Sequence, residues 1–259
     1  MSKEHVVRVA VGGSAQWGVV REQRVFALTG SPFDPQAPGS ELGAVPDMMF
    51  LAPVQPSKII CVGRNYPAHA AEHQAPLPVE PLLFFKPPSS VIGPGAEIVL
   101  PSQSQQVEHE AELAIVIGRH CHHVSAEQAW QYVWGVTCGN DVTARDLQRQ
   151  DPLWTRAKGF DTFCALGPWV VTELDAQDVA DLRVISRVNG QVRQDGCTRE
   201  MVFSPADLIA YISQIMTLEP GDVLMTGTPA GVGPLVPGDV VEIEVQNIGV
   251  LRNPVRDSR

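Results

Sequence analysis

The chain has 259 residues, of which 44% are hydrophobic and 19% charged, a size close to the largest that one hydrophobic core supports. Its formal net charge of −10 argues against nucleic acids and anionic membranes as partners, because both require a basic surface, but it permits a locally positive site for a small anion. The 22 glycines and 22 prolines indicate many turns and favour a β-rich chain over a helical bundle.

The cysteines and the apolar segments bear on the cellular compartment. The five cysteines are widely spaced and form no CxxC pair, which argues against a disulfide framework or a zinc site and suits a reducing environment. The first residues, MSKEHVVRVAV, lack the apolar stretch of a secretion signal, and no apolar run approaches the roughly 20 residues of a membrane span. We therefore expect a soluble, cytoplasmic protein.

The N-terminal part is expected to form a small β domain. Residues 5–10 and 17–28 contain the β-branched residues of short strands. The stretch SPFDPQAPGSELGAVPD that follows is rich in Pro, Gly and Asp and is typical of a loop or linker. We expect a small N-terminal β domain at 1–52 and a main body at 53–259.

The main body is predicted to alternate strands with short helices. Strands are expected at 58–63, 81–86, 112–118 and 133–142, and short helical segments within 64–73 and 125–133. The pair Asn189-Gly190 within 178–193 predicts a hairpin turn. A helix is predicted over 204–216, where Ser204 provides a cap and a proline follows at the first helical position.

Glu108, Glu110 and Glu112 occupy alternate positions in VEHEAELAIVIGR. Side chains at i and i+2 of a strand share a face, so these carboxylates would point one way and the intervening side chains toward a core. The pattern fits a solvated strand face, but it also fits a site for a hard cation that relieves the repulsion between like charges. Asp141, at the end of another apolar strand, is a third candidate ligand.

Six segments occur in the order expected of the fumarylacetoacetate hydrolase family, which the chain resembles over about residues 57–259. They are CVGRNYPAHAAEH, LFFKPPSSVIGPG, VEHEAELAIVIG, GVTCGNDVTARDLQ, WTRAKGFDTFCALGPWV and GDVLMTGTPAGVGP. The first ~50 residues resemble the N-terminal extension of some bacterial members. The resemblance implies a β-rich α+β fold, with a mixed β-roll core, short flanking helices and a small N-terminal β unit, usually assembled as a homodimer.

The resemblance also implies a metal site. In the family, the E-x-E of a strand and a later aspartate bind one divalent cation, Mg²⁺ or Mn²⁺, and these positions are Glu110, Glu112 and Asp141 in this sequence. Glu108 lies outside the pattern, and we expect it to be a surface charge or a charge that supports the ligands. Three carboxylates leave about half of an octahedral shell for water and a 2-oxo acid.

His69, Glu72 and Lys158 are the candidate catalytic residues. His69 and Glu72 lie three residues apart and share a helical face, a spacing that by itself favours a surface pair. The resemblance implies instead that they form a dyad on a mobile lid, which activates water or moves a proton, and that His73 beside them lacks this role. Lys158 matches the family lysine that meets the oxo or enolate oxygen of the substrate.

Arg145 and Gln148 match positions that line the pocket beside the metal. Arg145 is equally expected to form a structural ion pair with Asp146 or another acid. The segment GTPAGVG (227–233) lacks the pattern of a phosphate-binding loop, and the resemblance places Thr228 at the pocket as a donor to a substrate carboxylate.

Two further segments contain candidate residues. Arg64 and Lys86 are expected to contact a carboxylate or to help close the lid. The histidine-rich RHCHH (119–123) looks like a metal-binding tract, but its position after a strand and its polarity are more typical of a solvated turn.

The resemblance implies a divalent-metal-dependent enzyme that acts on small anionic 2-oxo acids or their enols through a metal-stabilised enolate. The expected activity is that of a 2-hydroxyhepta-2,4-diene-1,7-dioate isomerase or decarboxylase of aromatic catabolism. Acylpyruvate C–C hydrolysis and oxaloacetate decarboxylation are the alternatives, since all share one type of intermediate. A non-catalytic, metal-stabilised dimeric binding protein is an alternative of a different class.

Overall fold

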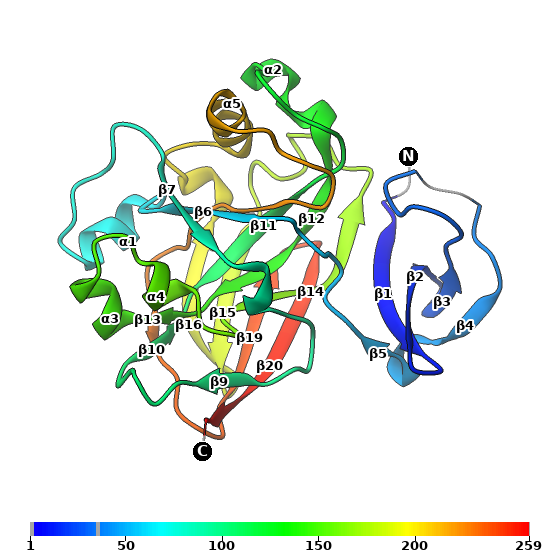
Figure 1. Cartoon of the computed structure of the whole chain (residues 1–259), viewed down its shortest axis with the longest axis horizontal. Coiled ribbons are helices and arrows are strands. Elements are labelled where there is room, and N and C mark those ends of the chain that lie inside the picture. Colours follow the sequence, from blue (N-terminus) through cyan, green and yellow to red (C-terminus); the bar gives the residue numbers. More distant parts are fainter. Residues whose placement is uncertain (1–2, 35–36, 259) are drawn as a thin grey trace.

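The computed structural model describes residues 3–34 and 37–258. It is β-rich with short helices, and the predicted fold class is confirmed (Figure 1). The strands are β1 (His5–Val11), β2 (Ser14–Arg21), β3 (Arg24–Ala27), β4 (Glu41–Ala44), β5 (Met49–Phe50), β6 (Ile59–Gly63), β7 (Leu82–Lys86), β8 (Val91–Ile92), β9 (Ile98–Leu100), β10 (Val107–His109), β11 (Ala111–Ile117), β12 (Val133–Asp141), β13 (Thr143–Ala144), β14 (Cys164–Thr172), β15 (Arg183–Val188), β16 (Gln191–Cys197), β17 (Val223–Met225), β18 (Gly233–Pro234), β19 (Val240–Val245) and β20 (Gly249–Asp257). The α-helices are α1 (Pro67–Glu72), α2 (Ala126–Ala129), α3 (Arg145–Gln150), α4 (Thr155–Lys158) and α5 (Pro205–Ile215).

One large sheet runs through the molecule in the order β4-β3-β2-β1-β14-β12-β11-β17-β6-β7. The N-terminal strands, at the right of Figure 1, surround a small apolar cluster that contains Val7, Val9 and Val25. They are joined to the main body because β1 pairs antiparallel with β14, with His5 opposite Val171. The division of the chain at residue 52 stays a prediction.

The main core lies between the large sheet and a second sheet of order β16-β15-β19-β20-β9. Strands β11, β12 and β14 pack against β15, β19 and β20. Leu113 and Ile115 enter this core from β11, and Ile243 and Leu251 enter it from the second sheet. On the opposite side of β11, Ala114 joins a separate buried cluster. From Leu113 onward the strand is therefore apolar on both faces, as is typical of a strand buried on both sides.

Two local predictions are confirmed. The Asn189-Gly190 turn connects β15 to β16, and both residues have the positive φ angles that such a tight turn needs (52° and 76°). Helix α5 begins after Ser204, whose hydroxyl accepts a hydrogen bond from the Asp207 N–H at 3.3 Å. Among the described residues this 11-residue helix is the longest, and none of the helices is long and apolar enough to cross a membrane.

The interpretation of the glutamate pattern as a solvated strand face is wrong, because Glu108, Glu110 and Glu112 are all buried. The run is also not one strand: β10 ends at His109 and pairs with β13 and β18, whereas β11 begins at Ala111 in the large sheet. The junction between the two strands therefore places these carboxylates inside the protein.

Candidate active site

The pairing of β11 with β12 brings three carboxylates together. Glu112 lies opposite Gly139 in the antiparallel register, and the Asp141 N–H donates to the carbonyl oxygen of Glu110 at 3.0 Å. As a result, carboxylate oxygens of Glu110, Glu112 and Asp141 all lie within 4.8 Å of one another. The structure thus gathers the three side chains that the sequence nominates as ligands, and the group could hold a divalent metal ion.

Buried cations surround these carboxylates. Lys158 Nζ donates to Glu110 Oε2 at 2.9 Å and to Asp141 Oδ2 at 2.7 Å. Lys86 Nζ donates to Asp141 Oδ1 at 2.5 Å. Arg145 donates to Glu110 Oε1 at 2.5 Å. Isolated buried charges are very costly, so this mutual pairing is what allows the groups to remain ionised inside the protein.

Glu108 completes the network as a buried partner of Arg145, at 2.7 Å. It is therefore not a surface charge, and the other expectation, a charge that supports the ligands, fits its position. Arg145 pairs with Glu108 and Glu110 and not with Asp146, whose carboxylate accepts bonds from Ser104 and from backbone N–H groups. The arginine both anchors the site and lines its cavity.

Glu112 differs from its neighbours in having no cation within 4.0 Å among the described residues. Its carboxylate accepts a hydrogen bond from the Gly227 N–H at 2.7 Å. Four carboxylates thus face three cationic groups, which leaves one negative charge in excess. An all-oxygen donor set with excess negative charge fits Mg²⁺ or Mn²⁺.

The pKa values of Glu110 and Glu112 reflect this imbalance of charge. Burial alone raises the pKa of the Glu110 carboxyl, but Lys158 and Arg145 outweigh burial and hold it well below the ordinary value. Burial, reinforced by the charges of Asp141 and Glu110, raises the pKa of Glu112 well above the ordinary value. The site therefore contains one carboxylate that is held ionised by the protein and one that lacks a compensating charge.

Helix α1, which lines one side of the cavity described below and is called the lid, carries the candidate dyad. Pro67 occupies its first turn, and Asn65 just before it is fixed by hydrogen bonds to Phe203 O and Thr226 O at 3.0 and 2.8 Å. His69 is buried and its Nδ1 lies 3.3 Å from Glu72 Oε2. Burial lowers the pKa of His69 below 6.5, while the charge of Glu110 opposes this effect. The imidazole is thus neutral near pH 7 and able to accept a proton.

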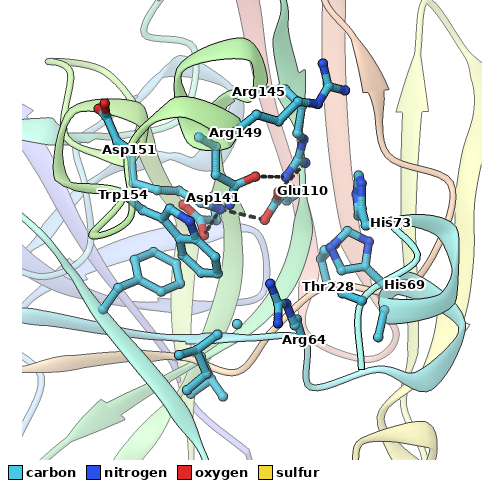
Figure 2. A pocket seen from close by; sticks show the side chains of 18 of the residues that line it. Arg64, His69, His73, Glu110, Asp141, Arg145, Arg149, Asp151, Trp154 and Thr228 are labelled. Carbon is cyan, nitrogen blue, oxygen red and sulfur yellow. Dashed lines mark hydrogen bonds and ion pairs between the residues drawn. The ribbon is translucent and has the colours of Figure 1, made fainter. Parts of the chain in front are cut away.

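A cavity of about 740 Å³ lies between the lid and the carboxylates. In Figure 2, His69 and His73 lie side by side on the lid segment, Glu110 lies near the centre, and Trp154 lines the opposite wall. The lining includes nine of the predicted site residues, namely Arg64, His69, Glu110, Glu112, Asp141, Arg145, Gln148, Lys158 and Thr228. Glu72 reaches His69 from the lid.

The candidate substrate-binding residues have different surroundings. The Thr228 hydroxyl donates to Ala111 O at 2.8 Å and accepts from Gln194 Nε2 at 2.7 Å, so it is already engaged within the protein. Gln148 Oε1 accepts from Arg145 at 2.5 Å. The Arg64 guanidinium lies 6.0 Å from the centre of the Trp154 ring. Lys86, in contrast, is fully engaged with the protein carboxylate Asp141 and does not line the cavity.

Sequence reasoning missed several residues at this site. Gln194, in the middle of β16, accepts from His109 Nδ1 and from the Ala111 N–H, and donates to Thr228 and to Pro229 O. It therefore connects the β10–β11 junction with the loop at 227–233. Arg149, Asp151 and Trp154 line the cavity, and only Trp154 lies in a segment that the family resemblance had drawn attention to.

Comparison with known proteins finds family models, relatives and solved structures that are similar to this chain. A model of the fumarylacetoacetate (FAA) hydrolase C-terminal domain matches residues 58–256, and a model of the Rv2993c-like N-terminal domain matches residues 4–53. The chain is 51% identical to Protein Rv2993c of Mycobacterium tuberculosis over 209 residues, covering 81% of this chain and 79% of that protein. It is 48% identical to the mitochondrial oxaloacetate tautomerase FAHD2A of Homo sapiens over 219 residues, covering 81% and 70%. The crystal structure of 2-hydroxyhepta-2,4-diene-1,7-dioate isomerase from Mycobacterium marinum has a TM-score of 0.90 and 41% identity, and covers 98% of this chain and 99% of that one.

The fold and the site define a β-rich protein in which carboxylates able to hold a divalent metal are gathered at one cavity. The sequence and structural similarities extend over most of the chain. The chain belongs to the fumarylacetoacetate hydrolase family, whose members are enzymes with isomerase, hydrolase or tautomerase activity.

Proposed function

We propose that this protein is a Mg²⁺- or Mn²⁺-dependent enzyme that moves a proton in a small 2-oxo acid or its enol, with a dicarboxylate as its substrate. The observation that carries the proposal is the placement of the His69–Glu72 dyad on a lid over the same cavity as Glu110, Glu112 and Asp141. A proton acceptor and a candidate metal site then face one bound ligand.

The metal would be held by Glu110, Glu112 and Asp141, and when bound it would act as a Lewis acid on the 2-oxo group and neutralise the excess negative charge. Arg145 and Lys158 fix the geometry of these carboxylates through the buried ion pairs described above. Lys158 also lines the cavity, so its ammonium group is placed to stabilise negative charge that develops on the oxo oxygen.

His69 is the proton carrier in this proposal. Its Nε2 is the nitrogen left for the substrate, because Nδ1 is directed to Glu72. Glu72 fixes the orientation of the ring and stabilises the imidazolium that forms when His69 accepts a proton. The reverse transfer, to another carbon or oxygen of the same substrate, completes a tautomerisation or isomerisation without net consumption of water.

The arginines of the cavity wall suit a dicarboxylate. Arg64 and Arg149 line the cavity in addition to the Arg145 and Lys158 groups at the carboxylates. An arginine can bind a second carboxylate through two parallel hydrogen bonds. Two relatives with similar sequences, an oxaloacetate tautomerase and a 2-hydroxyhepta-2,4-diene-1,7-dioate isomerase, are named for dicarboxylate substrates, which supports this choice.

C–C hydrolysis of an acylpyruvate is the second candidate. The same dyad could take a proton from water instead of carbon, since Glu72 orients His69 equally for either donor. Decarboxylation of oxaloacetate requires less of the dyad than isomerisation or hydrolysis does, because it needs only a proton donor after loss of CO₂. A metal-stabilised binding protein without catalysis is the alternative of another class.

The test is a panel of oxaloacetate, acetylpyruvate and a hydroxyheptadienedioate, followed by NMR in D₂O with Mg²⁺ or Mn²⁺. We expect accelerated enol–keto interconversion or isomerisation with deuterium incorporation. His69→Ala should abolish it while calorimetry gives an unchanged affinity for Mg²⁺. His73→Ala, one helical turn away, is the matched control and should remain active. Cleavage products would favour the second candidate, and a wild type as inert as His69→Ala would favour the binding protein.

The resemblance to the family also underlies our proposal of a cytoplasmic homodimer. Light scattering of the metal-loaded protein at micromolar concentration should give twice the chain mass of 28.1 kDa. A mass of one chain that persists at high concentration would contradict it.

A further inference from the structure

The lid carries a second group of possible metal ligands, apart from the three buried carboxylates. Donor atoms of His69, Glu72 and His73 all lie within 4.8 Å of one another. The backbone fixes this arrangement, because the His73 N–H donates to the His69 carbonyl oxygen at 3.3 Å and so places the two histidines one helical turn apart. Two histidines at i and i+4 on one helical face are a recurrent zinc-binding spacing.

The side chains of His69, Glu72 and His73 would need to move little to bind one zinc ion. Ligands on a tetrahedral zinc with bonds of about 2.0–2.1 Å are about 3.3 Å apart, and His69 Nδ1 lies 3.3 Å from Glu72 Oε2. The His73 ring stands edge-on to the His69 ring, with centroids 4.7 Å apart. Since His73 is exposed, its ring can turn to direct a nitrogen at the same point.

The donor types separate this group from the carboxylate site. Two imidazoles with one carboxylate suit Zn²⁺, Co²⁺ or Ni²⁺, whereas three carboxylates suit Mg²⁺ or Mn²⁺. His69 and His73 both line the cavity (Figure 2), so an ion can reach them from the cavity.

We infer that the lid contains a second metal site, in which His69, Glu72 and His73 bind Zn²⁺ or a similar transition-metal ion. The Gly231 N–H also donates to both Glu72 oxygens, at 3.1 Å to Oε1 and at 3.3 Å to Oε2. When Oε2 binds the ion, Oε1, the closer of the two, can keep α1 attached to the loop at 227–233. Zinc would fasten the lid in the closed arrangement.

The consequence for activity rests on the proposed function, whereas the binding itself does not. Zinc bound to His69 and Glu72 prevents these two residues from transferring a proton. The ion is then an inhibitor, although the proposed reaction needs Mg²⁺ or Mn²⁺ at the carboxylates.

Binding is tested by calorimetry with zinc alone on the full chain in millimolar Mg²⁺, and by the visible absorption of bound Co²⁺. We expect one zinc ion per chain. His73→Gln should weaken its binding by about tenfold or more through loss of one ligand, whereas Glu112→Gln, which damages the carboxylate site, should leave it unchanged. His122→Gln, in the exposed RHCHH segment, is the matched surface control. Thermal melting of each variant checks that it is folded.

Unchanged zinc affinity in His73→Gln, or loss of zinc from Glu112→Gln or His122→Gln, would overturn the inference. For inhibition, His73→Gln should turn over as the wild type does at pH 8 but need at least about ten times more zinc for half-inhibition. If the wild type has no turnover on the substrate panel, the proposed function fails, and the calorimetric and Co²⁺ measurements still decide whether the lid binds a metal.

Discussion

Gly231 donates its backbone N–H to the Glu72 carboxylate at 3.1 Å. The same carboxylate lies 3.3 Å from His69 Nδ1, so one side chain both attaches the lid to the loop at 227–233 and orients the candidate base. The contact of α1 with this loop and the geometry of the dyad therefore depend on the same side chain.

Substitutions at Glu72 should separate these two effects. Glu72→Gln keeps an acceptor oxygen for the Gly231 N–H but loses the negative charge beside His69, whereas Glu72→Ala loses both. We expect kcat to fall by about 100-fold in both variants, since general-base catalysis contributes about 10²–10⁴, and KM to rise only in Glu72→Ala. Steady-state kinetics at fixed Mg²⁺ would measure this split, and equal KM values would show that the Gly231 contact does not hold the lid.

A pair of glycine substitutions tests how tightly the loop at 227–233, which contacts α1, is packed. Gly231 and Gly238 both have positive φ, at 100° and 92°, but a Cβ on Gly231 would lie 2.2 Å from Arg193 O, whereas one on Gly238 meets nothing within 4 Å. Gly238→Ala should cost about 1 kcal/mol through backbone strain. Gly231→Ala should lower the free energy of unfolding by at least about 1 kcal/mol more, because the backbone must also move. Urea denaturation compares them, and equal losses would mean that the loop adjusts freely.

Glu112 should make the metal-free protein sensitive to pH. Its pKa is higher in the folded than in the unfolded chain, so the folded state binds its proton more tightly. Stability therefore falls as pH rises above the ordinary value of 4.5, and the loss is complete above the raised pKa. Glu110, whose pKa is lowered, acts in the opposite direction, with a contribution that is lost only as pH falls through that lowered value.

Two measurements follow for Glu112. Glu112→Gln should raise the Tm of the metal-free protein at pH 8 and leave its Tm at pH 4.5 nearly unchanged. Mg²⁺ should raise the Tm of the wild type more at pH 8 than at pH 5, and should not stabilise Glu112→Gln. A variant less stable than the wild type at pH 8 in the presence of EDTA would contradict the excess of negative charge at the site.

The pH dependence of turnover should report the titration of His69. Burial lowers its pKa below 6.5, and a nearby charge on His73 lowers it further, against the effect of Glu110. The neutral base predominates above that pKa, so kcat/KM should decline only below pH 6.5. His73→Ala should move this acid limb to higher pH by removing a positive neighbour. An acid limb above pH 6.5, or one that moves the other way in His73→Ala, would argue against His69 as the base.

Local signals made part of the fold predictable. The Asn189-Gly190 turn and the Ser204 cap act within a few residues, so the sequence pattern is sufficient to locate them. The break between β2 and β3 falls at Glu22 and Gln23, which adopt positive φ without the glycine that such a turn usually requires. The residue types in the sequence therefore gave no indication of where this turn lies.

The environment of the glutamates could not be read from their spacing. Alternation indicates which side chains share a face, but the cover on that face comes from Arg145 and Lys158, 35 and 48 residues from Glu110. The family resemblance nominated the candidate metal ligands, which the pattern alone leaves open. Gln194 lies 85 residues from His109 and carries no motif, so only the folded chain brings it to the site.

The lid helix α1 contributes little to the interior, since His69 and Ala70 are its only buried residues among those described. The carboxylates lie where β11 begins and β12 ends, on two central strands of the large sheet, and two of them form buried ion pairs with Lys158, Lys86 and Arg145. Substitutions at the exposed positions of helix α1, 67, 68, 71 and 72, should consequently disturb the core little. In this architecture the helix that carries the dyad is the part free to vary in sequence, and the buried carboxylate site is the fixed part.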